Sequence, residues 1–141
     1  MNAHHKVFVG SQDSRHNAAG LKERGIRAVL DVAFGDIVGQ SVDKNEDLEE
    51  VLRLPLLDEP SQPLQQTLET ALAFLDRCEQ RGVPVLVHCN AGISRSVSVC
   101  VAFLMRKYSI GYDEALATIR VTRPSAKPNA GFEAQLRKWK K

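Results

Sequence analysis

The sequence predicts a single α/β domain spanning residues 1–141. Short apolar runs bounded by turn residues alternate with longer segments whose apolar residues recur at helical spacing, a pattern typical of α/β proteins. No internal repeat, low-complexity tract or linker divides the chain. A chain of 141 residues is long enough to bury one core of its own.

Four segments are predicted as strands: residues 6–9, 27–32, 51–56 and 83–88. The last of them, VPVLVH, is apolar nearly throughout, as expected for a strand covered on both faces. The segment 34–50 shows no clear period and is rich in Gly, Asp and Glu, so we expect a loop there with at most one short helix.

Helices are predicted after the third and fourth strands. Within residues 61–82 the apolar positions share one helical face, and Gly82 stands where a helix stop is expected. A second helix is predicted over 93–108 and a third from Gly111, where Asp113 and Glu114 suit the positive first turn and Pro124 prevents simple continuation. Asn129 is a candidate N-cap for a final helix.

The composition excludes several classes of protein. A net charge of +2 is too balanced to favour a nucleic-acid partner. We see no signal peptide, and the longest apolar run, residues 97–105, is too short to span a bilayer, so no membrane association is expected. Three widely spaced cysteines fit neither a disulfide framework nor a zinc site. These features favour a reducing, cytoplasmic setting with nuclear access open, and no metal or cofactor.

The segment VPVLVHCNAGISRSVSV, residues 83–99, carries the predicted chemistry. A buried strand ends at His88, a tight loop runs from Cys89 to Arg95, and a helix follows at once. Backbone N–H groups of such a loop and the helix N-terminus form a nest that binds a tetrahedral anion. Gly92 allows a sharp turn close to the anion, and the planar fork of Arg95 can hold two phosphate oxygens.

The same field is expected to favour the thiolate of Cys89, which makes it a nucleophile aimed at a bound phosphorus. Ser96 can hydrogen-bond that sulfur and stabilise it as a leaving group. His88 is expected to order the loop by hydrogen bonds rather than to titrate in catalysis. A merely packed cysteine at position 89 would leave the spacing of Gly92, Arg95 and Ser96 unexplained.

The string HCNAGISRS resembles the His-Cys-x5-Arg-Ser/Thr signature of cysteine-based protein tyrosine phosphatases, in the version typical of the small dual-specificity branch. The segments VFVGS, GIRAVLDVA and RPSAKPNAGFEAQL are also similar to that branch. The resemblance implies a central mixed sheet of four or five strands with helices on both faces. Two features depart from the pattern: Asp31 stands where many relatives carry Asn, and only six residues precede VFVG, so the usual opening strand is expected to be short or absent.

An acid is needed to protonate the leaving oxygen of the ester. Asp58 follows a predicted strand and precedes a loop bracketed by prolines, and the resemblance places the acid of relatives in the corresponding loop. Glu59 is the neighbouring alternative. Asp36, Asp43 and Asp47 are weaker candidates, since they are expected in a solvated loop.

The short chain leaves little room for a loop that would deepen the pocket. A shallow pocket admits phosphoserine and phosphothreonine as well as phosphotyrosine, so we expect phosphorylated proteins as substrates. A phosphoinositide or RNA 5′-phosphatase is a weaker alternative, because the loop residues after the nucleophile are uncharged: Asn90, Ala91, Gly92, Ile93 and Ser94. A non-catalytic phosphoprotein-binding module is the other alternative, which hydrolysis of an aryl phosphate would exclude.

Overall fold

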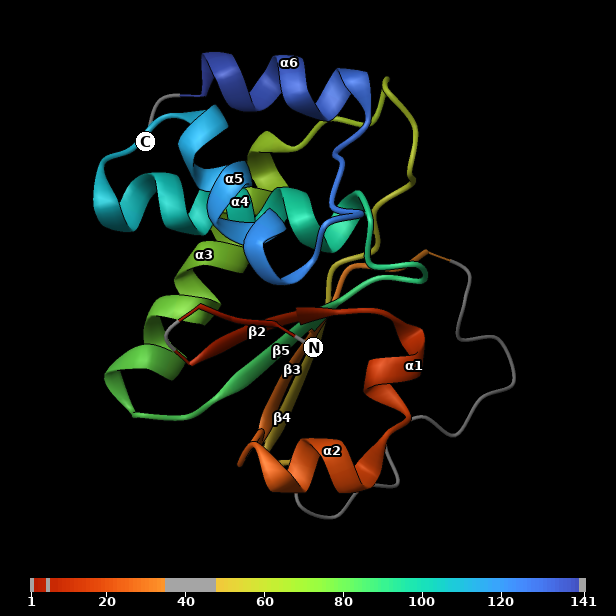
Figure 1. Cartoon of the computed structure of the whole chain (residues 1–141), viewed down its shortest axis with the longest axis vertical. Helices are drawn as coiled ribbons and strands as arrows, with labels where there is room; N and C mark the ends of the chain where they lie inside the picture. Colours follow the sequence, from red (N-terminus) through yellow and green to blue (C-terminus); the bar gives the residue numbers. More distant parts are fainter. Residues whose placement is uncertain (1, 5, 35–47, 140–141) are drawn as a thin grey trace.

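A mixed five-stranded sheet forms the centre of the protein in the computed structural model, which describes residues 2–4, 6–34 and 48–139 (Figure 1). The strand order is β1-β2-β5-β3-β4. Four strands are parallel, and the short β1 pairs antiparallel with β2 at one edge. The strands are β1 (Asn2–His4), β2 (Val7–Gly10), β3 (Ala28–Asp31), β4 (Glu50–Arg53) and β5 (Val85–His88).

Helices cover both faces of this sheet. On one face lie α1 (Gln12–Arg15) and α2 (Ala18–Glu23); on the other lie α3 (Gln65–Gln80), α4 (Arg95–Tyr108), α5 (Tyr112–Thr122) and α6 (Ala130–Lys138) (Figure 1). The sheet register explains the division, because alternate residues of a strand point to opposite faces. Phe8, Leu86, Val29 and Val51 are aligned across the sheet and pack under α2.

The main core lies on the α3–α6 side. Helix α4 supplies the largest share of it, with every side chain from Ser96 to Met105 buried. Helix α3 turns one apolar face, including Leu68, Leu72 and Leu75, toward the same core. Burying an aliphatic side chain of this size contributes about 1.5–3 kcal/mol to the free energy of folding. A shift of α4 along its axis would expose several such side chains, so its packing against the sheet and the other helices fixes the position of its first residue.

The predicted architecture is confirmed, with differences at the ends of elements. Helix α4 begins at Arg95 rather than at 93, because Ser94 belongs to the loop before it. Gly82 has a φ of +68° after α3, and Asn129 caps α6 by accepting a hydrogen bond from the Phe132 amide, both as expected. An opening strand, β1, is present although it is short. Helices α1 and α2 were not predicted, and most of the expected loop 34–50 lies outside the described residues.

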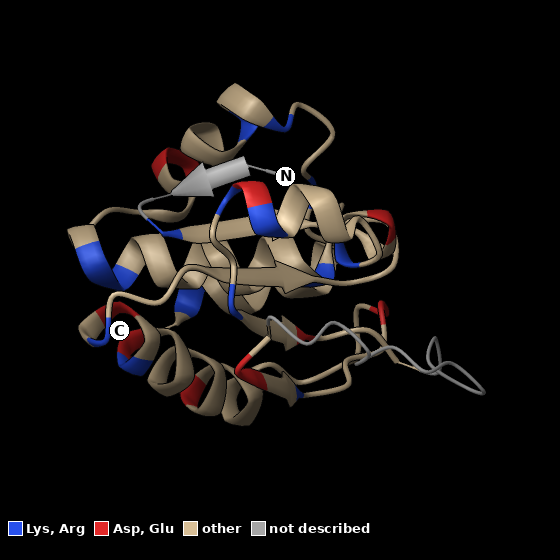
Figure 2. Ribbon diagram, turned by 90° about the horizontal axis from the view of Figure 1, so that it is seen from below, with Lys and Arg blue, Asp and Glu red and all other residues tan. Residues whose placement is uncertain are grey.

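The carboxyl ends of β2, β5, β3 and β4 meet at one edge of the sheet because these strands are parallel. The last aligned positions across this edge are Gly10, His88, Asp31 and Arg53. Acidic and basic residues are interspersed over the elements (Figure 2). No helix among residues 2–4, 6–34 and 48–139 is long and apolar enough to cross a membrane.

Candidate active site

The loop between β5 and α4 has its carbonyl groups held from outside. All six carbonyl oxygens from Cys89 to Ser94 have a nitrogen partner within hydrogen-bond distance. Four different parts of the chain supply these partners: His88, the start of α1, the α5–α6 connection and α4. In sequence order they are His88 Nδ1 (3.3 Å), Gln12 N (2.9 Å), Arg123 Nη2 (3.2 Å), Arg123 Nε (2.6 Å), Lys127 N (2.7 Å) and Ser98 N (2.8 Å).

This arrangement directs the loop's amides to the inner side. In a trans peptide the C=O and N–H groups point in opposite directions, so a carbonyl held outward leaves its amide facing inward. Gly92 takes a φ of +71°, and a Cβ there would collide with the Arg123 guanidinium and lie 2.8 Å from the Gly10 carbonyl. The loop is therefore shaped as a nest for an anion, and glycine is required at its tightest point.

Cys89 lies at the base of this nest with only 1% of its surface exposed. The Gly92 amide donates to its sulfur at 3.2 Å, and Ser96 Oγ lies 3.2 Å from the same atom. Ser96 Oγ also donates to the Gly10 carbonyl at 3.2 Å. The single hydroxyl proton of Ser96 thus has two acceptors within reach, and it can turn to the sulfur when the sulfur is negatively charged.

Arg95 begins α4 at the rim of the nest. Its side chain is half-buried, and Nη1 donates to the Leu56 carbonyl at 3.2 Å. Leu56 stands two residues before Asp58, so this contact joins the nest to the segment that carries the predicted acid. A guanidinium carries five N–H donors in a planar fork, a geometry that suits two phosphate oxygens at once.

Asp58 lies on an exposed loop that docks against the start of α6. Asn129 Nδ2 donates to Asp58 Oδ1 at 3.0 Å, while the Asn129 amide donates to Ser94 Oγ at 2.9 Å. One residue therefore contacts both the predicted acid and the phosphate loop. Two further contacts hold the same loop: a Cβ on Gly131 would collide with the backbone of Pro60, and Gln135 accepts from the Leu64 amide and donates to the Gln62 carbonyl.

His88 is fully buried behind the nest. Its Nε2 lies 3.0 Å from Arg15 Nη1 and 3.9 Å from Asp31 Oδ1. Burial lowers the pKa of the imidazole to about 4. The Asp31 carboxylate acts in the opposite direction, and the positive charge of Arg15 adds to the lowering. A neutral His88 agrees with its predicted role in ordering the loop.

The chain matches the model of the dual specificity phosphatase catalytic domain family over residues 7–141. The chain belongs to this family. It is 40% identical over 119 residues to dual specificity protein phosphatase 12 of Homo sapiens, a match covering 83% of this chain and 34% of that protein. It is also 41% identical over 90 residues to dual specificity protein phosphatase 22 of Homo sapiens, covering 64% of this chain and 49% of that protein. The chain thus spans between a third and a half of the length of these relatives.

A solved structure supports the same fold. The crystal structure of DUSP15 superposes with a TM-score of 0.88 at 27% identity, covering 98% of this chain and 85% of that one. The dual specificity phosphatase family consists of cysteine-dependent phosphomonoesterases, and the expected resemblance to its small members is confirmed.

The residues predicted from the signature lie together in the structure. His88, Cys89, the five loop residues 90–94, Arg95 and Ser96 form one continuous site, and Asp58 is joined to it through Asn129. Glu59 is exposed and makes none of the described hydrogen bonds of this site. Asp36, Asp43 and Asp47 lie outside the described residues.

Three residues of the site were not identified from sequence: Arg123, Arg15 and Asn129 in its bridging role. Each lies more than 30 residues along the chain from the residue that it contacts. Arg15 also lies on α1, which is too short to show a helical period of apolar residues. The sequence signal that could have indicated Arg123 and Asn129 is the string RPSAKPN, in which two chain-stiffening prolines separate polar residues.

The other two cysteines are packing residues. Cys100 is buried inside α4, as expected, and burial followed by the charge of Cys89 raises the pKa of its thiol. Cys78 is also buried in the core, where desolvation raises the pKa of its thiol, so it is more than an incidental residue near a helix end. Within the described part of the chain no three His, Cys, Asp or Glu side chains are grouped as metal ligands.

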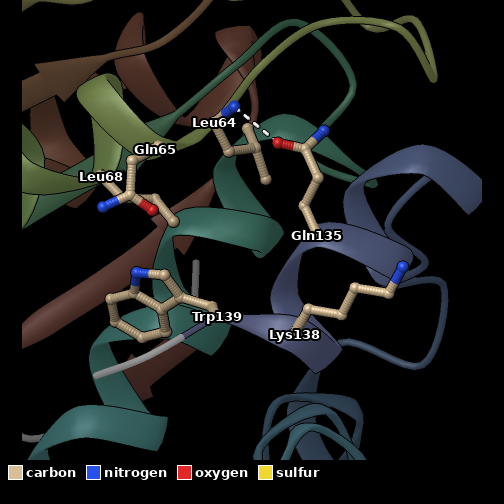
Figure 3. A pocket seen from close by; sticks show the side chains of 6 residues that line it. All are labelled: Leu64, Gln65, Leu68, Gln135, Lys138 and Trp139. Atoms are coloured by element: carbon tan, nitrogen blue, oxygen red, sulfur yellow. Dashed lines mark hydrogen bonds between the residues drawn. The ribbon is translucent and has the colours of Figure 1, made fainter.

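A separate pocket of about 510 Å³ lies between the start of α3 and helix α6 (Figure 3). None of its lining residues belongs to the phosphate loop, and we assign it no catalytic role. It shares Leu64 and Gln135, with their mutual hydrogen bond, with the contacts that hold the Asp58 loop. The lining residues are Leu64, Gln65, Leu68, Gln135, Lys138 and Trp139.

Proposed function

We propose that the protein is a dual-specificity protein phosphatase that hydrolyses phosphotyrosine and phosphoserine or phosphothreonine on proteins through a phosphocysteine intermediate. The single observation that supports this most is the ring of outward-held carbonyls around Cys89. A loop built in this way presents donors to an anion before any substrate arrives, so little reorganisation is needed during the reaction.

The first step transfers the phosphoryl group to sulfur. The Cys89 thiolate attacks phosphorus, an S–P bond forms, and the bond from phosphorus to the ester oxygen breaks. Asp58 gives its proton to that oxygen, which departs as the alcohol of the substrate side chain. Arg95 and the inward-facing amides hold the three remaining phosphoryl oxygens.

The second step releases phosphate. The Asp58 carboxylate takes a proton from a water molecule as the water attacks phosphorus, and the S–P bond breaks to return the Cys89 thiolate. The hydroxyl of Ser96, 3.2 Å from the sulfur, can donate to it as negative charge develops there. The positions of Asp58 and Ser96 support their assignment to these roles.

The uncharged loop residues 90–94 support protein substrates over phosphoinositides or RNA 5′-phosphates, whose additional phosphates would favour positive charge in the loop. Steady-state hydrolysis of an aryl phosphate and of phosphotyrosine and phosphothreonine peptides tests the proposal. We expect turnover of all three, abolished by Cys89→Ser with binding of the phosphopeptides retained. Equal affinity and no turnover in both proteins would instead support a binding module.

The role of Asp58 has its own test. Replacement by Asn should slow hydrolysis of alkyl phosphates by about 10²–10⁴-fold, because expulsion of an alkoxide needs a proton. The loss on aryl phosphates with good leaving groups should be far smaller. Equal losses on the two substrates would remove Asp58 from the role of acid, and Glu59→Gln is the matched control on the same loop.

A further inference from the structure

A row of charged and polar side chains, three buried and one half-buried, lies directly behind the phosphate loop, and the mechanism above does not use most of it. His88, Asp31 and Arg53 occupy aligned positions on β5, β3 and β4, so their side chains project from the same face of the sheet. Arg15 approaches this face from α1 and is only 4% exposed. A buried guanidinium is costly unless it has partners, so its position calls for an explanation.

The two neighbours of His88 Nε2 make opposite demands on that atom. Arg15 carries only N–H donors, so a hydrogen bond from Arg15 requires an unprotonated Nε2 with a free lone pair. The Asp31 carboxylate accepts only, so it would favour a proton on Nε2. The distances decide between them: Arg15 Nη1 lies at 3.0 Å, within hydrogen-bond range, and Asp31 Oδ1 at 3.9 Å, beyond it.

Asp31 has other donors, which is why it leaves Nε2 to Arg15. Its Oδ1 accepts from the Ala33 amide at 2.9 Å, and its Oδ2 accepts from Arg53 Nη1 at 2.9 Å. The Ala33 amide and the Arg53 side chain therefore fix the Asp31 carboxylate in place. From there it supplies negative charge to the Arg15–His88 pair without a hydrogen bond to the imidazole.

The consequence appears on the other nitrogen of the ring. A neutral imidazole without a proton on Nε2 carries it on Nδ1. Nδ1 lies 3.3 Å from the Cys89 carbonyl, which accepts only. The bond from Nδ1 to this carbonyl holds the first peptide of the phosphate loop with its oxygen outward, and so with the Asn90 amide inward.

We propose that Arg15 is a positioning residue that keeps His88 in its neutral Nδ1–H form, with Asp31 as its counter-charge, and thereby fixes the first peptide of the anion-binding loop. Removal of Arg15 would leave Asp31 as the dominant neighbour of Nε2. His88 would then gain a proton on Nε2, either by changing tautomer or by becoming an imidazolium. In the changed tautomer the Nδ1 lone pair faces the Cys89 oxygen, and the bond that holds the first peptide is lost.

The groups that face His88 from its surroundings are Arg15 on α1, His16 at the C-terminal end of α1, Asp31 on β3 and the Cys89 carbonyl. His16 is exposed and bonds to Gln12 instead. The inference concerns the state of His88 in the free protein; only its consequence for catalysis depends on the function proposed above.

The test is two-bond ¹H–¹⁵N NMR of the imidazole nitrogens in protein labelled at histidine, with His88 assigned from the signal missing in His88→Gln. In the wild-type protein at pH 7 we expect Nδ1 to show the shift of a protonated nitrogen and Nε2 that of an unprotonated one. A protonated Nε2 in the wild-type protein overturns the proposal without any further variant.

Two substitutions of Arg15 extend the test. Arg15→Met should place a proton on Nε2, whereas Arg15→Lys, which keeps a donor-only cation, should retain the wild-type pattern. Arg24→Met is the matched control, because it removes an exposed arginine from the neighbouring helix region with the same change of charge. If Arg15→Met folds and leaves the protonation pattern of His88 unchanged, the proposal is wrong. If Arg15→Met does not fold, Arg15→Lys decides instead, and a protonated Nε2 in that variant would refute the proposal.

Binding of inorganic phosphate links the state of His88 to the loop. We expect Arg15→Met to weaken it about 3- to 10-fold, the effect of one hydrogen bond, and Arg15→Lys and Arg24→Met to leave it near the wild-type value. Unchanged phosphate affinity in an Arg15→Met protein whose Nε2 is protonated and whose Nδ1 is not would refute the coupling to the loop. Catalytic failure of the wild-type protein would refute the proposed function while leaving the NMR result intact.

Discussion

The depressed pKa of His88 makes a specific contribution to stability that should be lost on mild acidification. The ordinary value of 6.5 falls to about 4 in the folded protein, chiefly because the ring is buried. Between these two values the unfolded chain binds a proton that the folded protein does not. The free energy of unfolding therefore falls as the pH decreases from 6.5 toward 4, and at higher pH the contribution is fully present.

The size of the effect follows from the same two values. Their difference corresponds to about 3 kcal/mol at roughly 1.4 kcal/mol per pKa unit. This is a substantial fraction of the stability of a typical domain, about 5–15 kcal/mol. Because His88 has no exposed surface, solvent screening does not reduce it appreciably.

Urea unfolding followed by circular dichroism, at several pH values from 7 to 4, measures this contribution. We compare the wild-type protein with His88→Gln, since carboxylates titrate in both and their effects cancel in the difference. The wild-type protein should lose about 3 kcal/mol more than the variant over this range. His16→Gln controls for the replacement of one imidazole. Parallel pH dependences for the wild-type protein and His88→Gln would refute the reasoning.

Three further substitutions test the loop contacts. Gly92→Ala should abolish anion binding and cost at least about 1–2 kcal/mol, because φ is +71° there and the added Cβ meets Arg123; urea unfolding and phosphate titration measure both. Gly131→Ala should displace the Asp58 loop from α6, because the added Cβ would collide with the Pro60 backbone. The rate of hydrolysis should then fall more on alkyl than on aryl phosphates, whereas the control Ala134→Ser, on the exposed side of α6, should change neither rate. Ser96→Ala should slow phosphocysteine breakdown, so a burst of alcohol release in rapid-quench kinetics is expected; a steady rate with no burst would speak against this role.

The sequence predicted the central elements of this fold because they carry strong patterns. The run VPVLVH is long and apolar enough to indicate β5, and the spacing of Leu68, Leu72 and Leu75 indicates α3. Helices α1 and α2 have four and six residues, which is too short for a 3.6-residue period to appear. Their formation depends instead on side-chain caps by Ser11 and Asn17 and on packing against the sheet.

The site divides in the same way. Cys89, Gly92, Arg95 and Ser96 were predictable because one short segment holds them at informative spacings. The supports of that segment come from distant parts of the chain and have no local signature. Asp31 illustrates the limit: the sequence shows an acid at the end of a predicted strand, but only the fold reveals Arg53 and His88 beside it.

The residues that hold the carbonyl groups of the phosphate loop lie on distant parts of the chain, so the loop can lose its anion-binding conformation before the whole protein unfolds. Three of its carbonyls, those of Ala91, Gly92 and Ile93, depend on the connection between α5 and α6 through Arg123 and Lys127. Local opening of that connection would release half of the nest while the sheet stays intact. Phosphate binding should accordingly be lost at lower urea concentrations than the circular dichroism signal of the folded protein. Amide hydrogen exchange in the loop should follow the opening of this connection rather than global unfolding.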